Sequence, residues 1–134
     1  MKKITENFTM EEFIRSETAE RLGIQNEPDS RAKLALVNLC TKLLQPLREA
    51  YGKAMPVNSG YRCPELNEAV NGSKNSQHMK GEAADIRCDH PAELVRCLME
   101  EGLDFDQCIR YSTFVHLSYK LEGENRRQFL KGGY

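Results

Sequence analysis

The sequence predicts an α+β fold in which a small antiparallel sheet has helices packed on one side. Two observations support this prediction. Segments with helical apolar spacing dominate the first half of the chain, and runs rich in β-branched and aromatic residues cluster in the second half. The chain has 134 residues, of which 40% are hydrophobic and 29% charged. This length and composition predict one globular domain over residues 1–134, with its own core.

The first half is expected to contain two helices. Thr9 and Glu12 have the spacing of a capping box, and Phe8 and Phe13 flank it as a hydrophobic staple, which predicts a short helix over residues 10–16. A longer helix is expected from about residue 30 to residue 51, where Pro46 should bend or end the last turn. Its core face carries apolar residues at helical spacing: Leu36, Leu39, Cys40, Leu43, Leu44 and Leu47.

The second half should alternate short helices, loops and strands. Residues 64–70 read as a helix closed by Asn71-Gly72, and residues 73–81 as a loop. Residues 82–88 read as a strand, and a further helix begins at Pro91 and ends before Gly102. Two β-rich runs follow, over residues 105–111 and 114–119, and we expect them to form a hairpin through Ser112-Thr113. A last short strand is expected near residues 127–130.

Charge and cysteine usage exclude several classes of protein. The chain has 19 Lys and Arg against 20 Asp and Glu, so it lacks the basic excess of a nucleic-acid or membrane-surface binder. No apolar run approaches the length of a membrane span, and no apolar segment follows the basic residues at the start. We therefore expect a protein that is cytoplasmic as synthesised, does not insert into membranes, and is monomeric. The five cysteines form no Cys-x-x-Cys pair and are expected to be free thiols, with Cys40 and Cys97 in the core.

The residues most suggestive of chemistry are two histidines and one aspartate. Asp85 lies between Ala84 and Ile86 in a predicted strand, where a buried carboxylate needs a cation or hydrogen bonds. A turn at Gly81 brings the strand back past His78, and His116 lies in a neighbouring predicted strand. Two imidazoles, one carboxylate and a water would form an open tetrahedral Zn²⁺ site of the catalytic type.

Spacing alone leaves a second interpretation open. Asp85 would then pair with Arg62 or Arg87, and His116 would be a hydrogen-bonded core histidine. No His-Glu-x-x-His motif is present to decide between the two interpretations, and the third ligand is distant in the sequence.

Three motifs in order resemble those of a known family. The chain contains SGYRCPELN at 59–67, GSKNSQHMKGEAAD at 72–85, and the segments FDQ at 105–107 and FVHLSY at 114–119. They resemble the signature of the M15 zinc D-alanyl-D-alanine carboxypeptidases and related phage endolysins. That signature reads Ser-Gly-Tyr-Arg, then Ser-x-His-x-x-Gly-x-Ala-x-Asp, then a late His in a strand. The similarity extends from about Phe8 to Leu130.

The resemblance implies a set of roles and a fold. His78, Asp85 and His116 would be the Zn²⁺ ligands. Arg62 would face the substrate, where a guanidinium suits a terminal carboxylate or a developing oxyanion, and Ser76 would hydrogen-bond the substrate. The fold implied is hedgehog/DD-peptidase-like, and the reaction is attack of metal-activated water on a peptide bond.

The sequence departs from the family at the catalytic base. Relatives carry a glutamate or aspartate three or six positions before the last histidine, where this chain has Thr113 and Arg110. Asp106 is the only carboxylate between residues 105 and 119. Asp106 and Tyr111 are therefore the candidates for the catalytic role, with Glu82 as an alternative base.

The hairpin turn decides whether Asp106 faces the metal. A two-residue turn at Ser112-Thr113 sets Ile109 opposite His116, with Gln107 and Tyr111 on the same face and Asp106 on the other. A three-residue loop shifts the register by one residue and places Asp106 on the same face as His116.

Two functions are consistent with these residues. The first is a zinc peptidase that cleaves peptidoglycan stem peptides or D-Ala-D-Ala-type peptides, as a carboxypeptidase or an endolysin-type endopeptidase. Such an enzyme would be released to the cell wall during lysis, or would act as a cytosolic dipeptidase. The second is a catalytically impaired zinc-binding domain that binds a peptide or protein partner, as hedgehog-type relatives suggest. The missing glutamate favours the second function, and the retained Arg62, Ser76 and ligand set favour the first.

Overall fold

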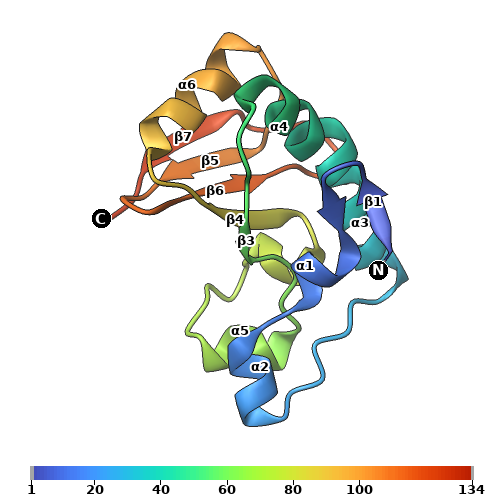
Figure 1. The fold of residues 1–134 in the computed structure, drawn as a ribbon. Coiled ribbons are helices and arrows are strands. Elements are labelled where there is room, and N and C mark those ends of the chain that lie inside the picture. Colours follow the sequence, from blue (N-terminus) through green and yellow to red (C-terminus); the bar gives the residue numbers. More distant parts are fainter. Residues whose placement is uncertain (1, 134) are drawn as a thin grey trace.

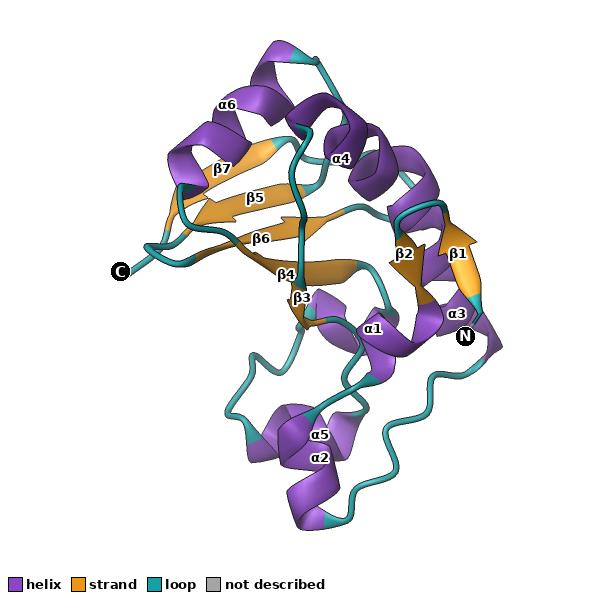
Figure 2. Ribbon diagram, viewed as in Figure 1, coloured by secondary structure: helices purple, strands orange, loops and turns teal. Residues whose placement is uncertain are grey.

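The computed structural model describes residues 2–133 and centres on a five-stranded sheet (Figures 1 and 2). Successive residues of a strand point to opposite faces of the sheet, so apolar side chains lie on one face and the predicted site lies on the other. Ala84, Ile86, Val115 and Leu117 are fully buried in the core. The strands, in sheet order, are β3 (Val57–Ser59), β4 (Ala83–Arg87), β6 (Phe114–Ser118), β5 (Gln107–Arg110) and β7 (Gln128–Lys131).

The register of the sheet sets the site. Asp85 of β4 pairs with His116 of β6, and His116 pairs on its other side with Ile109 of β5. Tyr111 N donates to Phe114 O at 2.9 Å, so the turn between β5 and β6 holds only Ser112 and Thr113. Of the two alternatives for the hairpin, the structure has the two-residue turn, with the pairing that this turn predicts.

The last strand corrects the prediction of a purely antiparallel sheet. β7 exists where the tail was expected to form a strand, but it pairs parallel to β5, with Gln107 opposite Gln128 and Arg110 opposite Lys131. The chain leaves β6 through residues 119–127 and passes the end of β5 before it pairs. The sheet is therefore mixed, with three antiparallel ladders and one parallel ladder.

One group of helices covers the apolar face of the sheet (Figure 1). Helix α6 begins at Pro91, and Gly102 follows its end, as expected. The long predicted helix runs on through Pro46, because a π-helical turn precedes the proline and Gln45 N donates to Cys40 O, five residues back. Pro46 therefore does not end it. These elements are α3 (Ser30–Leu39), the π-helix η1 (Cys40–Leu44), α4 (Gln45–Tyr51) and α6 (Pro91–Glu100).

The remaining elements lie toward the N-terminus and beyond the β3 edge (Figure 2). Thr9 N donates to the Glu12 carboxylate at 2.9 Å and the Phe8 and Phe13 rings pack 6.0 Å apart, which confirms the predicted capping box and staple. Helix α2, which the sequence analysis missed, is capped by Ser16. The elements are β1 (Lys3–Thr5), β2 (Phe8–Thr9), α1 (Met10–Ile14), α2 (Glu17–Leu22), α5 (Pro64–Ala69) and the 3₁₀-helix η2 (Gln77–Lys80).

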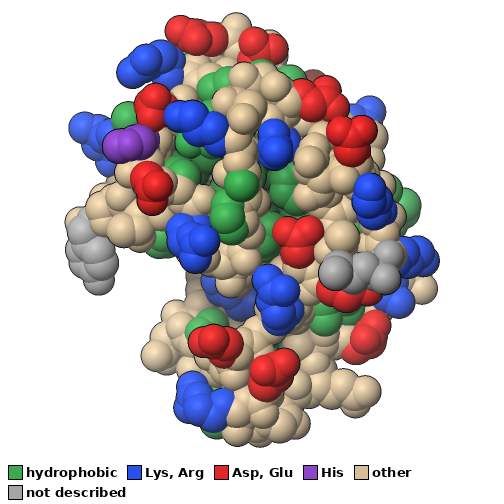
Figure 3. Space-filling model, viewed as in Figure 1, with side chains coloured by type: hydrophobic (Ala, Val, Ile, Leu, Met, Phe, Trp, Pro, Cys, Tyr) green, Lys and Arg blue, Asp and Glu red, His purple; other side chains and the backbone are tan. Residues whose placement is uncertain are grey.

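The surface carries charges of both signs, and the cysteines are unpaired, as the composition predicts. Acidic and basic side chains are interspersed on the face seen in Figure 3, and the molecule is hollowed between the sheet and the part that carries α2 and α5. All five cysteines are free thiols; Cys40 is buried as predicted, whereas Cys97 is only partly buried. None of the helices within residues 2–133 combines the length and apolar character needed to span a bilayer.

Candidate active site

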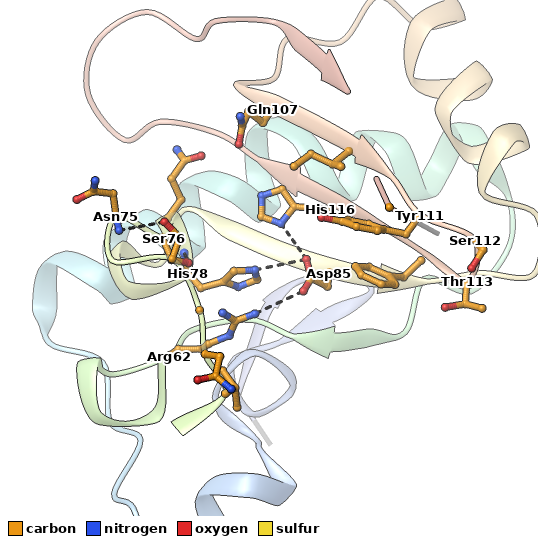
Figure 4. A pocket seen from close by; sticks show the side chains of 18 of the residues that line it. Arg62, Asn75, Ser76, His78, Asp85, Gln107, Tyr111, Ser112, Thr113 and His116 are labelled. Carbon is orange, nitrogen blue, oxygen red and sulfur yellow. Dashed lines mark hydrogen bonds and ion pairs between the residues drawn. The ribbon is translucent and has the colours of Figure 1, made fainter. Parts of the chain in front are cut away.

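An open cleft of about 820 Å³ lies between the polar face of the sheet and the segment that joins α5 to η2. Asp85, Gln107, Ile109, Tyr111 and His116 line it from the sheet, as the pairing predicts. The opposite wall comes from Arg62 and residues 70–78. Figure 4 shows His116 from the sheet and His78 and Arg62 from the opposite wall pointing toward Asp85.

His78 is held by hydrogen bonds to its backbone and its ring. Its backbone N donates to Ser76 Oγ at 3.1 Å, which starts η2. Its Nδ1 lies 2.6 Å from Gly60 O. Because a carbonyl oxygen only accepts, Nδ1 carries a proton, and Nε2 is the ring nitrogen that faces Asp85 Oδ1, 3.4 Å away.

The turn between His78 and Asp85 depends on Gly81. Gly81 has a φ of +75°, and a Cβ at this position would lie 2.3 Å from Ala32 O of α3. A larger residue is excluded by both the backbone conformation and the contact. The turn therefore packs closely on α3 while it leads the chain from η2 into β4, as the sequence predicts.

Asp85 and His116 complete a three-donor group. His116 Nδ1 lies 2.9 Å from Asp85 Oδ1, and one donor atom from each of His78, Asp85 and His116 lies within 4.8 Å of the others. Tetrahedral zinc with ligand bonds of about 2.0–2.1 Å requires donor separations of about 3.3 Å. The chemistry and proximity of the three donors fit such an ion after side-chain adjustment, and all three line the open cleft.

The Asp85 carboxylate is ionised in this setting. Burial alone raises the pKa of Asp85, but hydrogen bonds to His116 and His78 outweigh burial and hold the pKa well below its usual range. An ionised carboxylate is the form that binds a divalent ion.

Arg62 lies on the other oxygen of Asp85, outside the space between the three donors (Figure 4). Its Nη2 is 3.7 Å from Asp85 Oδ2, its Nε donates to Ser59 Oγ, and its Nη1 donates to Asn67 Oδ1. Burial lowers the pKa of Arg62, and the charge of Asp85 opposes this shift. The two interpretations left open by spacing are therefore compatible: Asp85 meets the imidazoles through one oxygen and Arg62 through the other.

Asn67 connects Arg62 to the loop that carries Ser76. It is almost fully buried, accepts from Arg62 and donates through Nδ2 to Ser73 O at 2.9 Å. Asn67 was not among the predicted site residues, because an asparagine inside a short helix gives no sign of which groups its side chain will bind. The signal available in the sequence was that Asn67 and Arg62 belong to the same motif, SGYRCPELN at 59–67.

Ser76 and Tyr111 both reach the cleft. Ser76 Oγ accepts from His78 N, which leaves its own proton free to donate. Tyr111 stacks on Phe114 with ring centroids 4.3 Å apart and an interplanar angle of 13°. The stacking fixes the Tyr111 ring on the His116 face of the sheet, where the two-residue turn predicts it.

The two candidate carboxylate bases do not line the cleft. Asp106 is fully buried and accepts from Arg126 N, Nε and Nη2, at 2.8, 3.0 and 2.7 Å. Glu82 is also buried and accepts from Gln77 Nε2 and Leu121 N. These positions correct the assignment of Asp106, and of Glu82 as the alternative, because each carboxylate is enclosed by partners away from the metal donors.

Replacement of Asp106 by asparagine should destabilise the fold in a pH-dependent way. Burial raises the pKa of Asp106, but hydrogen bonds and charge from Arg126 lower it further, so its folded pKa lies below its unfolded value. The stabilisation is therefore present above about pH 4 and lost as pH falls through the folded pKa. We expect Asp106→Asn to lower the free energy of unfolding by about 2 kcal/mol at pH 7 and by far less at pH 3. Urea unfolding at the two pH values measures the difference.

The control for this prediction is Asp104→Asn. Asp104 pairs with Arg127 at 3.1 Å on the surface, where such pairs contribute little, so the change should stay below about 0.5 kcal/mol. An equal destabilisation by Asp106→Asn at pH 7 and pH 3 would show that the ionised carboxylate is not the stabilising group.

Comparison with known proteins supplies a family. The Peptidase M15 family model matches residues 6–118. Over 81 residues the chain is 40% identical to the zinc D-Ala-D-Ala carboxypeptidase of Streptomyces albus G. That match covers 60% of this chain and 31% of the relative, so it spans less than a third of the relative's length. The matches and the His78–Asp85–His116 group together indicate Zn²⁺ as the cofactor. The chain belongs to the Peptidase M15 family.

Proposed function

We propose that this protein is a zinc peptidase that hydrolyses D-amino-acid-containing stem peptides of peptidoglycan, as a DD-carboxypeptidase or an endolysin-type endopeptidase. The observation that carries the proposal is the three-donor group His78–Asp85–His116, open to a cleft and flanked by a fixed arginine. Family membership and the relative from Streptomyces albus G support the class of reaction. A hedgehog/DD-peptidase-like fold is part of the same proposal.

Each residue of the site has a role that follows from its position in the cleft. His78, Asp85 and His116 hold Zn²⁺, which when bound polarises a carbonyl and lowers the pKa of water toward neutrality. Gly60 O fixes the His78 ring through Nδ1, which leaves Nε2 as the nitrogen that would bind the ion. The Arg62 guanidinium stabilises negative charge that develops on the substrate carbonyl. Ser76 and Tyr111 orient the peptide by donating hydrogen bonds from opposite walls of the cleft.

A second candidate is a zinc domain that binds a peptide without cleaving it. One observation favours it: within residues 2–133, Asp85 is the only carboxylate that lines the cleft. A general base near neutral pH is normally a carboxylate or a histidine, and tyrosine is a poor one. Tyr111 therefore acts in our proposal as a donor to the oxyanion and not as the base.

Incubation with cell-wall peptides separates the two candidates. We expect the zinc-loaded protein to release fragments from muropeptides, identified by mass spectrometry. His78→Ala should lose both the bound zinc and the cleavage, whereas His90→Ala, at the start of α6 on the surface, should lose neither. Peptide binding with stoichiometric zinc and no cleavage would establish the second candidate and contradict the first.

A further inference from the structure

The buried Asp106 holds one arginine, Arg126, at the mouth of the cleft. Two guanidinium nitrogens, Nε and Nη2, donate to the two carboxylate oxygens of Asp106, and Arg126 N donates as well. A guanidinium bound in this way to a buried carboxylate keeps one orientation, unlike a free surface arginine. Asp106 therefore acts on the cleft through Arg126.

The Arg126 guanidinium can still donate hydrogen bonds to a ligand in the cleft. Its side chain is 48% exposed and lines the same cleft as the metal donors. Among the described residues, Nη1 has no hydrogen-bond partner, because the hydrogen bonds to Asp106 use Nε and Nη2. Lys120 Nζ also lies 4.0 Å from Asp106 Oδ1, so two cations face one carboxylate and the cluster is left with a positive charge.

The sheet register places Arg126 at a defined distance from the metal donors. Ile109 lies opposite His116, and Gln107, two residues along β5, lies opposite Gln128 of β7. Arg126 precedes Gln128 by two residues and binds Asp106, beside Gln107. Asp106 is three residues along the chain from Ile109, so at about 3.3 Å per residue the cluster lies about 10 Å along the strand direction from His116, which is roughly three residues of an extended peptide.

We propose that Arg126 forms a carboxylate subsite that selects peptides with a free carboxylate besides the C-terminal one, about three residues from the bond at the metal centre. The inference rests on the proposed function, because it needs a peptide bound along β5. The family match ends at residue 118, so Arg126 lies in a part of the chain that the family model does not cover.

Two synthetic stem pentapeptides test the subsite. One carries the D-glutamyl and diaminopimelyl carboxylates free, and the other carries both as amides, with identical C-termini. We expect the zinc-loaded protein to favour the free carboxylates by about tenfold in kcat/KM, as one charge-assisted hydrogen-bonded contact provides. Arg126→Gln should reduce this ratio to below about twofold.

The controls separate binding from folding. Arg127→Gln removes the neighbouring arginine, which pairs with Asp104 and does not line the cleft, and should keep the preference. Arg126→Gln leaves the buried Asp106 without its main partner, so the double variant Asp106→Asn/Arg126→Gln, which removes both charges together, is measured in parallel. Zinc content and thermal midpoint are recorded for each variant.

Isothermal titration with the same two peptides keeps the test independent of hydrolysis. If neither peptide is cleaved, the proposed function fails, yet a preference in Kd that is lost in the double variant still supports the subsite. An equal affinity and rate for both peptides in the parent protein would overturn the inference. So would a preference that survives both variants.

Discussion

Replacement of Asp85 by asparagine is expected to reduce zinc affinity about a thousandfold. Asp85 is the charged member of the donor group, and its Oδ1 lies 2.9 Å from His116 Nδ1 and 3.4 Å from His78 Nε2. Protein zinc sites bind with roughly 10–16 kcal/mol, so loss of one of three protein donors costs on the order of 4 kcal/mol, or three decades in Kd. Asparagine keeps the size of the side chain, so the measured change reports the loss of the negative charge and of the carboxylate as a ligand.

Competition with a chelator of known affinity measures this effect. The thermal midpoint of the parent protein should rise with added zinc, and that of Asp85→Asn should not, because only binding to the folded state stabilises it. Asp104→Asn, a surface carboxylate paired with Arg127, serves as the control and should bind zinc like the parent. Unchanged zinc affinity in folded Asp85→Asn would mean that the ion does not bind at this group.

Replacement of Arg62 by glutamine should lower kcat/KM by about a hundredfold or more at saturating zinc. Removal of one preorganised donor to a developing oxyanion typically costs 10²–10³ in rate. Arg62 is suited to this role because Ser59, Asn67 and Asp85 hold it in one orientation before substrate arrives. Arg62→Lys keeps the charge but not the planar fork, and should recover only part of the activity.

Steady-state kinetics on the cleaved stem peptide measure the Arg62 effect. Arg96→Gln on α6, an exposed arginine on the opposite side of the sheet, is the matched control and should leave kcat/KM unchanged. Zinc content is measured for each variant, because Arg62 also contacts Asp85. Activity of Arg62→Gln within threefold of the parent, at equal zinc content, would show that Arg62 does not stabilise the reacting carbonyl.

Local sequence was a sufficient guide where the determining contacts are near in the chain. The capping box at Thr9 and the turn at Gly81 are present as predicted, and the hairpin forms at Ser112-Thr113, with the two-residue turn of the two alternatives considered. Each depends on contacts within a few residues or on a backbone conformation that one residue type prefers. From that turn the pairing of Ile109 with His116 follows by alternation alone.

Prediction failed where the partner of a side chain is distant in the sequence, or where the arrangement depends on several helices or strands together. Asp106 was a candidate base because it is the only carboxylate near His116 in sequence. Its partner Arg126 lies twenty residues later, and nothing local indicates the pair. The parallel pairing of β7 and the passage of the helix through Pro46 likewise depend on how whole elements pack, which periodicity does not report.

The order of residues by itself determined much of the secondary structure around the site and the shared face of Asp85 and His116 on the sheet, and the resemblance of its motifs to a family identified the zinc donors to be tested. The tertiary structure alone decided which carboxylates are available to a substrate. Availability depends on what surrounds a charge: Asp85 opens on the cleft, whereas Asp106 and Glu82 are enclosed by donors from distant segments. A buried carboxylate must be paired, and the identity of its partner is a property of the folded chain.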